Sequence, residues 1–100
     1  MAKVASREDI IEVLRKYKQE HQKEYGIEML GIFGSIARGQ ATEASDVDIV
    51  IRTKTPNLFL LSRIRQELEE QFHRHVDIVS YREKMNRFLK KRIDNEARYV

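Results

Sequence analysis

The chain has 100 residues, of which 41% are hydrophobic and 35% charged, enough for one domain that buries roughly 60–70% of its unfolded surface. The absence of cysteine excludes disulfides and thiolate metal sites, and no apolar run approaches the roughly 20 residues of a membrane span. The net charge of +3 is below what would imply nucleic-acid binding unaided. The N-terminal residues carry charge and no apolar signal core, so we expect a cytoplasmic protein.

The first predicted element is an amphipathic helix. Ser6, followed by Glu8 and Asp9, is typical of a helix start, with Ser6 as the N-cap and acids in the first turn. Apolar residues then recur at helical spacing at Ile10, Val13, Leu14 and Tyr17. We expect this helix to run to about Glu24, with Gly26 near its end.

Two strands are predicted next. Residues 27–33 are apolar on both faces, which indicates a central strand. A short helical turn and a polar loop should occupy 35–44, and the second strand should run from Asp46 to Arg52. The segment 53–57 contains the only proline and indicates a loop.

The second half of the chain predicts a helix, a third strand and a final helix. The helix at 58–72 has apolar residues at Leu58, Leu61, Ile64, Leu68 and Phe72. The strand should span 75–80, and the final helix, about 16 residues long, is marked by Met85, Phe88, Leu89, Ile93 and Ala97. This order predicts an α/β (α+β) fold, a small mixed β-sheet covered by helices, in a single domain of residues 1–100.

The second strand carries two aspartates, Asp46 and Asp48. Successive side chains of a strand alternate between its faces, so both point one way while Val47, Ile49 and Ile51 line the other face. Two carboxylates about 4 Å apart repel by roughly 4 kcal/mol at an effective dielectric near 20, so solvent or a cation must neutralise them. Hard oxygen ligands suit Mg²⁺, which typically binds one or two carboxylates plus substrate phosphates.

Upstream of the acids, Gly34-Ser35 interrupts the apolar strand. Such a turn offers a phosphate an approach free of side chains, backbone N–H groups and a hydroxyl. Gly-Ser is also a common choice for a simple strand-to-helix turn, and the downstream acids favour the phosphate-binding interpretation. Arg38 could pair with phosphate or with an acid, and Ser45 could orient the acid pair or cap the loop. Together these features indicate nucleotide chemistry.

A third acid, Asp77, interrupts the apolar strand at 76–79. A buried lone carboxylate would be costly there, and pairing with a metal shared by Asp46 and Asp48 would remove that cost. The alternative is an aspartate satisfied by backbone N–H groups at a strand end.

Two histidines, His73 and His75, flank the start of the third strand. Two imidazoles without a clear third ligand make a poor transition-metal site. We therefore expect both to be surface histidines.

Much of the basic charge falls in 82–98, at Arg82, Lys84, Arg87, Lys90, Lys91, Arg92 and Arg98. Charged residues usually form a solvated helix face, which is the simpler interpretation. The alternative is a docking surface for an acidic partner or a polynucleotide, whose signature would be loss of binding at modest salt.

Gly34-Ser35, ten residues, then Asp46-Val47-Asp48 resembles the signature of the polymerase-β-like nucleotidyltransferase superfamily. The chain is similar, from about residue 8 to its C-terminus, to the minimal nucleotidyltransferase (MNT) domains, and Asp77 stands where their third carboxylate is expected. The resemblance implies the polymerase-β-like nucleotidyltransferase fold. It also implies two Mg²⁺ ions and ATP as substrate.

The resemblance assigns roles to the candidate residues. The three aspartates named above would be catalytic and would hold the metal, Asp77 also helping to activate the acceptor hydroxyl. Gly34 and Ser35 would contact the β- and γ-phosphates. Arg38 and Ser45 are further candidates for nucleotide binding.

MNT domains of this kind pair with HEPN-domain proteins, which act as RNase toxins, and serve as antitoxins that transfer AMP from ATP to a toxin tyrosine. The resemblance therefore implies an adenylyltransferase antitoxin that releases pyrophosphate, with a HEPN toxin as partner and no membrane or direct nucleic-acid partner. Two alternatives stay open. The chain could neutralise its partner by binding alone, or it could transfer the nucleotide to a nucleic acid or a small molecule.

Overall fold

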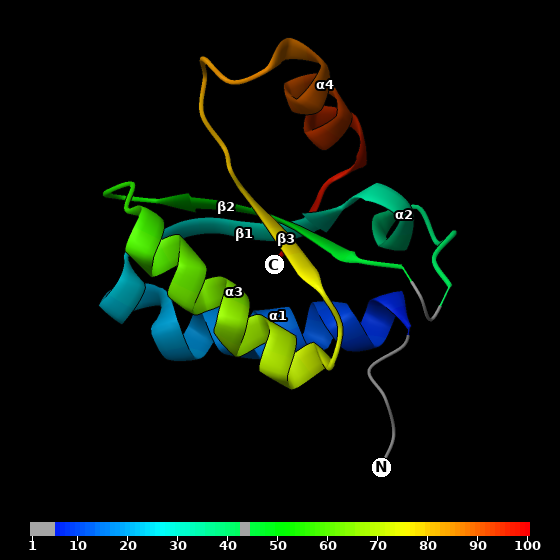
Figure 1. Cartoon of the computed structure of the whole chain (residues 1–100), viewed down its shortest axis with the longest axis horizontal. Helices are drawn as coiled ribbons and strands as arrows, with labels where there is room; N and C mark the ends of the chain where they lie inside the picture. The colour runs from blue at the N-terminus through cyan, green and yellow to red at the C-terminus, as the bar shows by residue number, and fades with distance from the viewer. Residues whose placement is uncertain (1–5, 43–44) are drawn as a thin grey trace.

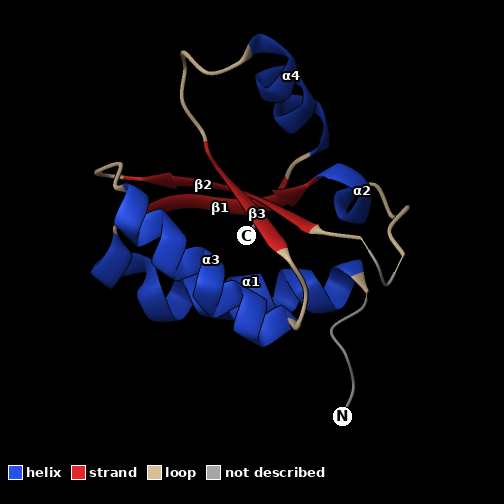
Figure 2. Ribbon diagram, in the orientation of Figure 1, coloured by secondary structure: helices blue, strands red, loops and turns tan. Residues whose placement is uncertain are grey.

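A four-stranded mixed sheet lies at the centre of the computed structural model, which describes residues 6–42 and 45–100. The helices are α1 (Arg7–Tyr25), α2 (Gly34–Ala37), α3 (Leu58–Phe72) and α4 (Arg87–Glu96), and the strands are β1 (Ile27–Phe33), β2 (Val47–Thr53), β3 (Val76–Ser80) and β4 (Arg98–Tyr99). Figures 1 and 2 show α1 and α3 on one face of the sheet and α4 over the other. The predicted small mixed sheet covered by helices is confirmed.

Strand order in the sheet is β3-β2-β1-β4. β1 pairs antiparallel with β2 and with β4, which confirms that this strand is central, and β2 pairs parallel with β3. The parallel pair is joined through α3, the helical crossover that parallel neighbours require. None of the helices in the described ranges is long and apolar enough to cross a membrane.

The predicted start and end of the first helix are confirmed. The Ser6 hydroxyl accepts a hydrogen bond from the Asp9 N–H at 3.1 Å, which satisfies one of the donors left free at a helix N-terminus. At the other end Gly26 adopts a left-handed φ of 64° and its N–H bonds to the Gln22 carbonyl. The helix reaches Tyr25, one residue beyond the expected end.

The side chains of the sheet divide between two apolar clusters. The larger cluster fills the space between the sheet and α1 and α3, and its strand residues include Ile32, Ile49 and Val76. The smaller cluster consists of Phe33, Val50 and Ile93, with partly buried side chains around them, and lies between the sheet and α4. The alternation predicted for the second strand is therefore confirmed: Val47, Ile49 and Ile51 face the larger core.

The final helix is shorter than predicted. α4 has 10 residues rather than about 16, because the Asn86 side chain caps it by accepting the Leu89 N–H and Ala97 is already extended. Met85 packs on the smaller core from the loop before the helix. Phe88, expected on the apolar stripe, is 80% exposed, and Leu58 at the start of α3 is likewise 83% exposed. Both periodic patterns thus begin earlier than the buried face does.

The edge strand β4 was not predicted. It pairs with β1 over the Gly31–Tyr99 and Ile32–Arg98 positions. A strand of two residues is too short to show the alternation by which strands are found in a sequence. The close approach of β4 to β1 depends on Gly31, because a Cβ at this position would lie 2.5 Å from the Arg98 carbonyl oxygen.

We expect Gly31→Ala to lower the free energy of unfolding by about 1–3 kcal/mol, because the added methyl must displace the backbone of β4. Denaturant unfolding followed by circular dichroism measures this loss. Glu28→Ala, an exposed site on the same strand, is the control and should change stability by less than about 0.5 kcal/mol. Equal stability of Gly31→Ala and the wild type would contradict the close approach of β4.

Candidate functional site

Three acids gather on the α4-facing side of the sheet. Asp48 in β2 lies directly opposite Asp77 in β3. Asp46 immediately precedes β2, and the N–H of the next residue, Val47, bonds to the His75 carbonyl of the neighbouring chain segment. Because side chains alternate along each strand, this register places Asp46, Asp48 and Asp77 on one face. The expectation that the first two acids share a face, with the third beside them, is met by the geometry.

Asp48 is the most enclosed of the three carboxyls. Burial raises its pKa above the ordinary value, the Asp77 carboxylate raises it further, and the Arg92 guanidinium opposes the rise. The carboxylate lies against the glycine turn, since a Cβ built on Gly34 would overlap Asp48 Oδ2. The carboxyl predicted to bind metal and the turn predicted to bind phosphate are therefore in contact.

His75 lies near both Asp46 and Asp77. The His75 Nδ1 atom is 3.6 Å from Asp46 Oδ1 and 3.7 Å from Asp77 Oδ1. The Asp77 side chain is 54% exposed, so the desolvation cost that a buried carboxylate would carry at this position is largely absent. The sequence also treated His75 as an ordinary surface histidine: it is exposed, but it belongs to the acidic group, while His73 is the residue that ends α3.

The Gly34-Ser35 turn begins α2. Gly34 has a left-handed φ of 77°, a backbone conformation that favours glycine, and it is buried. Its N–H donates to Glu96 Oε2 at 3.1 Å, and Arg38 Nη1 donates to both Glu96 oxygens at 3.0 Å. Arg38, whose role the sequence left open between phosphate and acid, thus pairs with an acid here.

Glu96 was missed by sequence reasoning. It is the last residue of α4, 62 positions from Gly34, and no motif links the two. Its side chain is only 19% exposed and also lies 3.9 Å from Arg92 Nε. A second unpredicted contributor is Arg74, whose Nη2 donates to the carbonyl oxygens of Thr42 and Ser45 at 2.7 and 2.6 Å.

Ser45 lies next to the acids in sequence and takes part in a turn. Its hydroxyl accepts the Thr42 N–H at 2.9 Å, and its own N–H bonds to the Thr42 carbonyl. Of the two roles considered, these contacts support the loop cap. Together with Arg74, Ser45 holds the backbone that leads into Asp46.

Part of the basic segment 82–98 is paired within the chain. Lys90 Nζ lies 3.3 Å from Glu83, and Arg92 lies near Glu96 with its guanidinium carbon 5.8 Å from the Phe33 ring centroid. Arg82, Lys84, Arg87, Lys91 and Arg98 are exposed. A docking role for this segment stays a prediction.

The donor set fits a hard divalent cation. Three carboxyls on one face supply the oxygen ligands that Mg²⁺ prefers, and two of them are exposed enough to reach an ion without desolvating a buried charge. One ligand atom from each of Asp46, His75 and Asp77 can be chosen so that all lie within 4.8 Å of one another. The residues present are therefore compatible with the metal that the sequence predicts.

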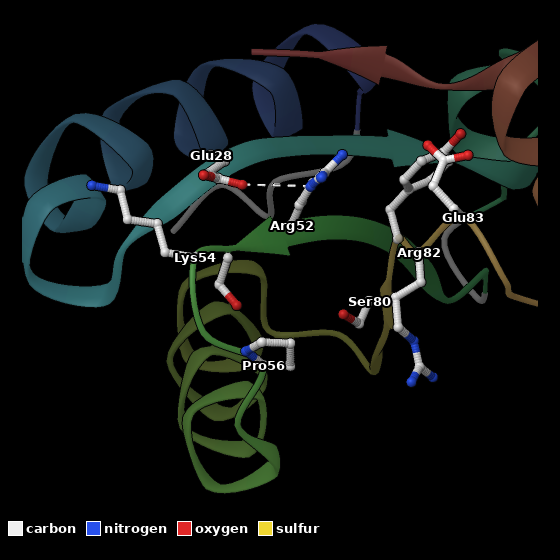
Figure 3. A pocket seen from close by; sticks show the side chains of 9 residues that line it. Glu28, Arg52, Lys54, Pro56, Ser80, Arg82 and Glu83 are labelled. Carbon is white, nitrogen blue, oxygen red and sulfur yellow. Dashed lines mark ion pairs between the residues drawn. The ribbon is translucent and has the colours of Figure 1, made fainter.

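A polar hollow of about 400 Å³ lies at the other end of the sheet (Figure 3). Its lining includes Thr53 and Ser80, the last residues of β2 and β3, and the Glu28–Arg52 ion pair at 3.4 Å. The acids instead lie where β2 and β3 begin. This hollow is therefore separate from the carboxylate site.

A family model and the similar proteins of known name point to the same protein family. Residues 14–100 match the family described as nucleotidyltransferase domain. The chain is 34% identical over 93 residues to a protein of Methanocaldococcus jannaschii named putative protein adenylyltransferase, covering 92% of this chain and 95% of that one. It is 36% identical over 73 residues to the protein adenylyltransferase MntA of Thermococcus cleftensis, covering 72% of this chain and 74% of that one.

Solved structures show the same fold. A structure named as a putative minimal nucleotidyltransferase superposes with a TM-score of 0.71 at 30% identity, covering 90% of this chain and 95% of that one. A complex of a tri-AMPylated Shewanella oneidensis HEPN toxin with its MNT antitoxin matches with a TM-score of 0.69 at 16% identity, covering 93% of this chain and 70% of that one. At 16% identity the likeness shows the fold alone.

We expect Gly34→Ala to destabilise the protein more than Gly39→Ala does. Both glycines have a positive φ, which costs an alanine roughly 1–2 kcal/mol, but only at Gly34 would the methyl meet the Asp48 carboxylate, while at Gly39 it would make an ordinary contact with Arg7 Nη1 at 3.8 Å. The difference between the two losses, measured by denaturant unfolding, should be about 1–3 kcal/mol. Equal losses would mean that Asp48 does not lie against the turn.

Proposed function

The chain belongs to the nucleotidyltransferase domain family, as an MNT domain, and we propose that it transfers AMP from ATP to a hydroxyl group of a partner protein. The observation that supports the proposal most directly is the contact between the Asp48 carboxyl and the Gly34-Ser35 turn, because it puts a group able to bind a metal beside N–H groups able to bind a phosphate. The relatives named protein adenylyltransferase support AMP as the group transferred and a protein as its acceptor.

The partner we propose is a HEPN toxin, so that the chain acts as an antitoxin. The fold shared with an MNT antitoxin in complex with its HEPN toxin supports this choice. We propose further that the acceptor is a tyrosine hydroxyl and that the modification inactivates the toxin.

The proposed reaction is a displacement at the α-phosphorus. The acceptor oxygen forms a bond to that phosphorus, the bond to the oxygen that bridges the α- and β-phosphates breaks, and pyrophosphate leaves. The proton of the acceptor hydroxyl passes to a carboxylate, a role that we assign to Asp77. Asp46, Asp48 and Asp77 would hold two Mg²⁺ ions, which when bound neutralise the charge of the phosphates.

Residues around the acids position the substrate. Gly34 and Ser35 offer backbone N–H groups to the β- and γ-phosphates, and the left-handed backbone at Gly34 keeps the approach free of a side chain. Arg38 adds a guanidinium beside the turn, where it can pair with a phosphate once it leaves Glu96. Arg74 and Ser45 hold the chain that leads to Asp46.

We expect Asp46→Asn and Asp48→Asn each to lower AMP transfer by roughly 100-fold or more, since metal ions at such sites contribute several kcal/mol and each 1.36 kcal/mol is tenfold in rate. The assay uses ATP labelled on the α-phosphate, Mg²⁺ and the purified product of the gene beside the chain's own, which the proposal expects to be a HEPN protein. Asp9→Asn, an exposed acid on α1, is the control.

The thermal midpoint of Asp48→Asn without metal should equal or exceed that of the wild type at neutral pH. Folding raises the pKa of Asp48, so the ionised carboxyl opposes folding above that pKa, and the neutral amide removes this penalty. Transfer at the wild-type rate by the Asn variants would overturn the site. Full neutralisation of the toxin in cells by an inactive Asn variant would favour the binding-only antitoxin.

Glu96 already occupies the donors that a triphosphate needs. The Gly34 N–H and the Arg38 guanidinium both bond to its carboxylate, so a nucleotide that uses them must displace Glu96. Glu96→Gln keeps the size of the side chain and removes its charge. Since hydrogen bonds to charged groups are worth roughly 1 kcal/mol more than neutral ones, we expect this variant to bind ATP about fivefold tighter.

Isothermal titration with a non-hydrolysable ATP analogue at fixed Mg²⁺ measures the effect of Glu96→Gln. Asp94→Asn is the matched control: this acid lies two positions earlier on α4 and accepts a hydrogen bond from the Tyr81 hydroxyl instead. Unchanged or weaker binding by Glu96→Gln would mean that the phosphates do not use the donors of Glu96.

A further inference from the structure

His75 occupies a position beside the acids that neither the motif nor the family match assigns. In the register of β2 and β3, Asp48 lies opposite Asp77, and the residues that precede them by two positions, Asp46 and His75, lie side by side. The sheet face thus presents a block of four potential ligand residues, three with oxygen and one with nitrogen. The imidazole is the only nitrogen ligand in this block.

The distances from His75 to each of the two acids are short enough for a shared ion. Two ligand atoms that are each about 2.1 Å from the same ion lie at most about 4.2 Å apart. The His75 Nδ1 atom is 3.6 Å from an oxygen of Asp46 and 3.7 Å from an oxygen of Asp77, within that limit. The His75 side chain is 56% exposed, so the imidazole can turn toward an ion without repacking a core.

The chemistry of the imidazole then decides which ion is preferred. Mg²⁺ binds carboxylates, water and phosphate oxygens, whereas imidazole nitrogen suits transition-series ions such as Fe²⁺, Ni²⁺ and Zn²⁺. Mn²⁺, which belongs to the same series, also accepts carboxylate oxygens, so a site of two carboxylates and one imidazole can hold it. We propose that His75 is a direct ligand of the metal held by Asp46 and Asp77, and that it makes this site bind Mn²⁺ and its transition-metal neighbours in preference to Mg²⁺. The inference rests on the proposed function in that these acids hold the metal.

The chain offers a matched pair of variants. His75→Gln removes the imidazole at an exposed site, where substitutions usually change stability by less than about 0.5 kcal/mol. His73→Asn removes the neighbouring exposed histidine, which ends α3 with a φ of 55°, a conformation that asparagine tolerates. Only the first substitution should alter metal binding.

The experiment uses tag-free protein loaded with Mn²⁺ and no nucleotide, so that neither a tag imidazole nor a base nitrogen competes. Electron spin-echo spectroscopy should show modulation from a bound nitrogen in the wild type and in His73→Asn, and none in His75→Gln. The Kd for Mn²⁺, from the signal of the free ion, should rise by about tenfold or more in His75→Gln. The Kd for Mg²⁺, measured by competition, should change by less than about twofold, because that ion takes oxygen ligands.

Two results would overturn the inference. Absence of nitrogen modulation in the wild type would mean that the ion is held by oxygen alone. Unchanged or tighter Mn²⁺ binding by His75→Gln would mean that the imidazole only forms ion pairs with the acids, which a metal ion would have to replace.

The proposed function fails separately from the inference. Nitrogen-bound Mn²⁺ in a protein that transfers no AMP with either metal would support the role of His75 and overturn adenylyl transfer. AMP transfer by a protein whose Mn²⁺ shows no bound nitrogen would leave the function standing and overturn the role of His75.

Discussion

In the parallel pairing of β2 with β3, Asp48 lies opposite Asp77, and the whole acidic face depends on this register. A shift of one residue would turn Asp77 and His75 to the other side of the sheet, into the core against α1 and α3. The register is held by the apolar residues between the acids, because Val47, Ile49 and Val76 are fully buried on that opposite side. Core packing on one face therefore sets the chemistry of the other.

α4 completes the acid-bearing face without closing it. Ile93 packs on Phe33 and Val50, which fixes the helix over the sheet, and the helix ends at Glu96 beside the glycine turn. The acids lie where β2 and β3 begin, and Asp46 and Asp77 remain exposed. The same helix thus buries a small core and carries the carboxylate that holds Gly34 and Arg38.

Local patterns account for what could be predicted. Caps such as Ser6 and Gly26, and the alternation around Asp46 and Asp48, are set by neighbours within a few residues, so the sequence alone reveals them. The apolar periodicity was less reliable near helix ends: Leu58 and Phe88 continue the helical spacing but nothing covers them in the described part of the chain. Periodicity states which residues share a face and not whether that face is buried.

The sequence by itself determined all the elements except the edge strand β4, although it made the final helix too long, and it determined the motif of glycine turn and aspartates, because each arises from short-range spacing. Only the tertiary structure decided that Glu96 bonds to Gly34 across 62 residues, that Arg74 holds the chain before Asp46, and that β4 pairs beside Gly31. It also decided that His75 lies close to two acids, Asp46 and Asp77. These contacts join segments whose relative positions follow from packing around the sheet. Residue type and local spacing do not reveal such contacts.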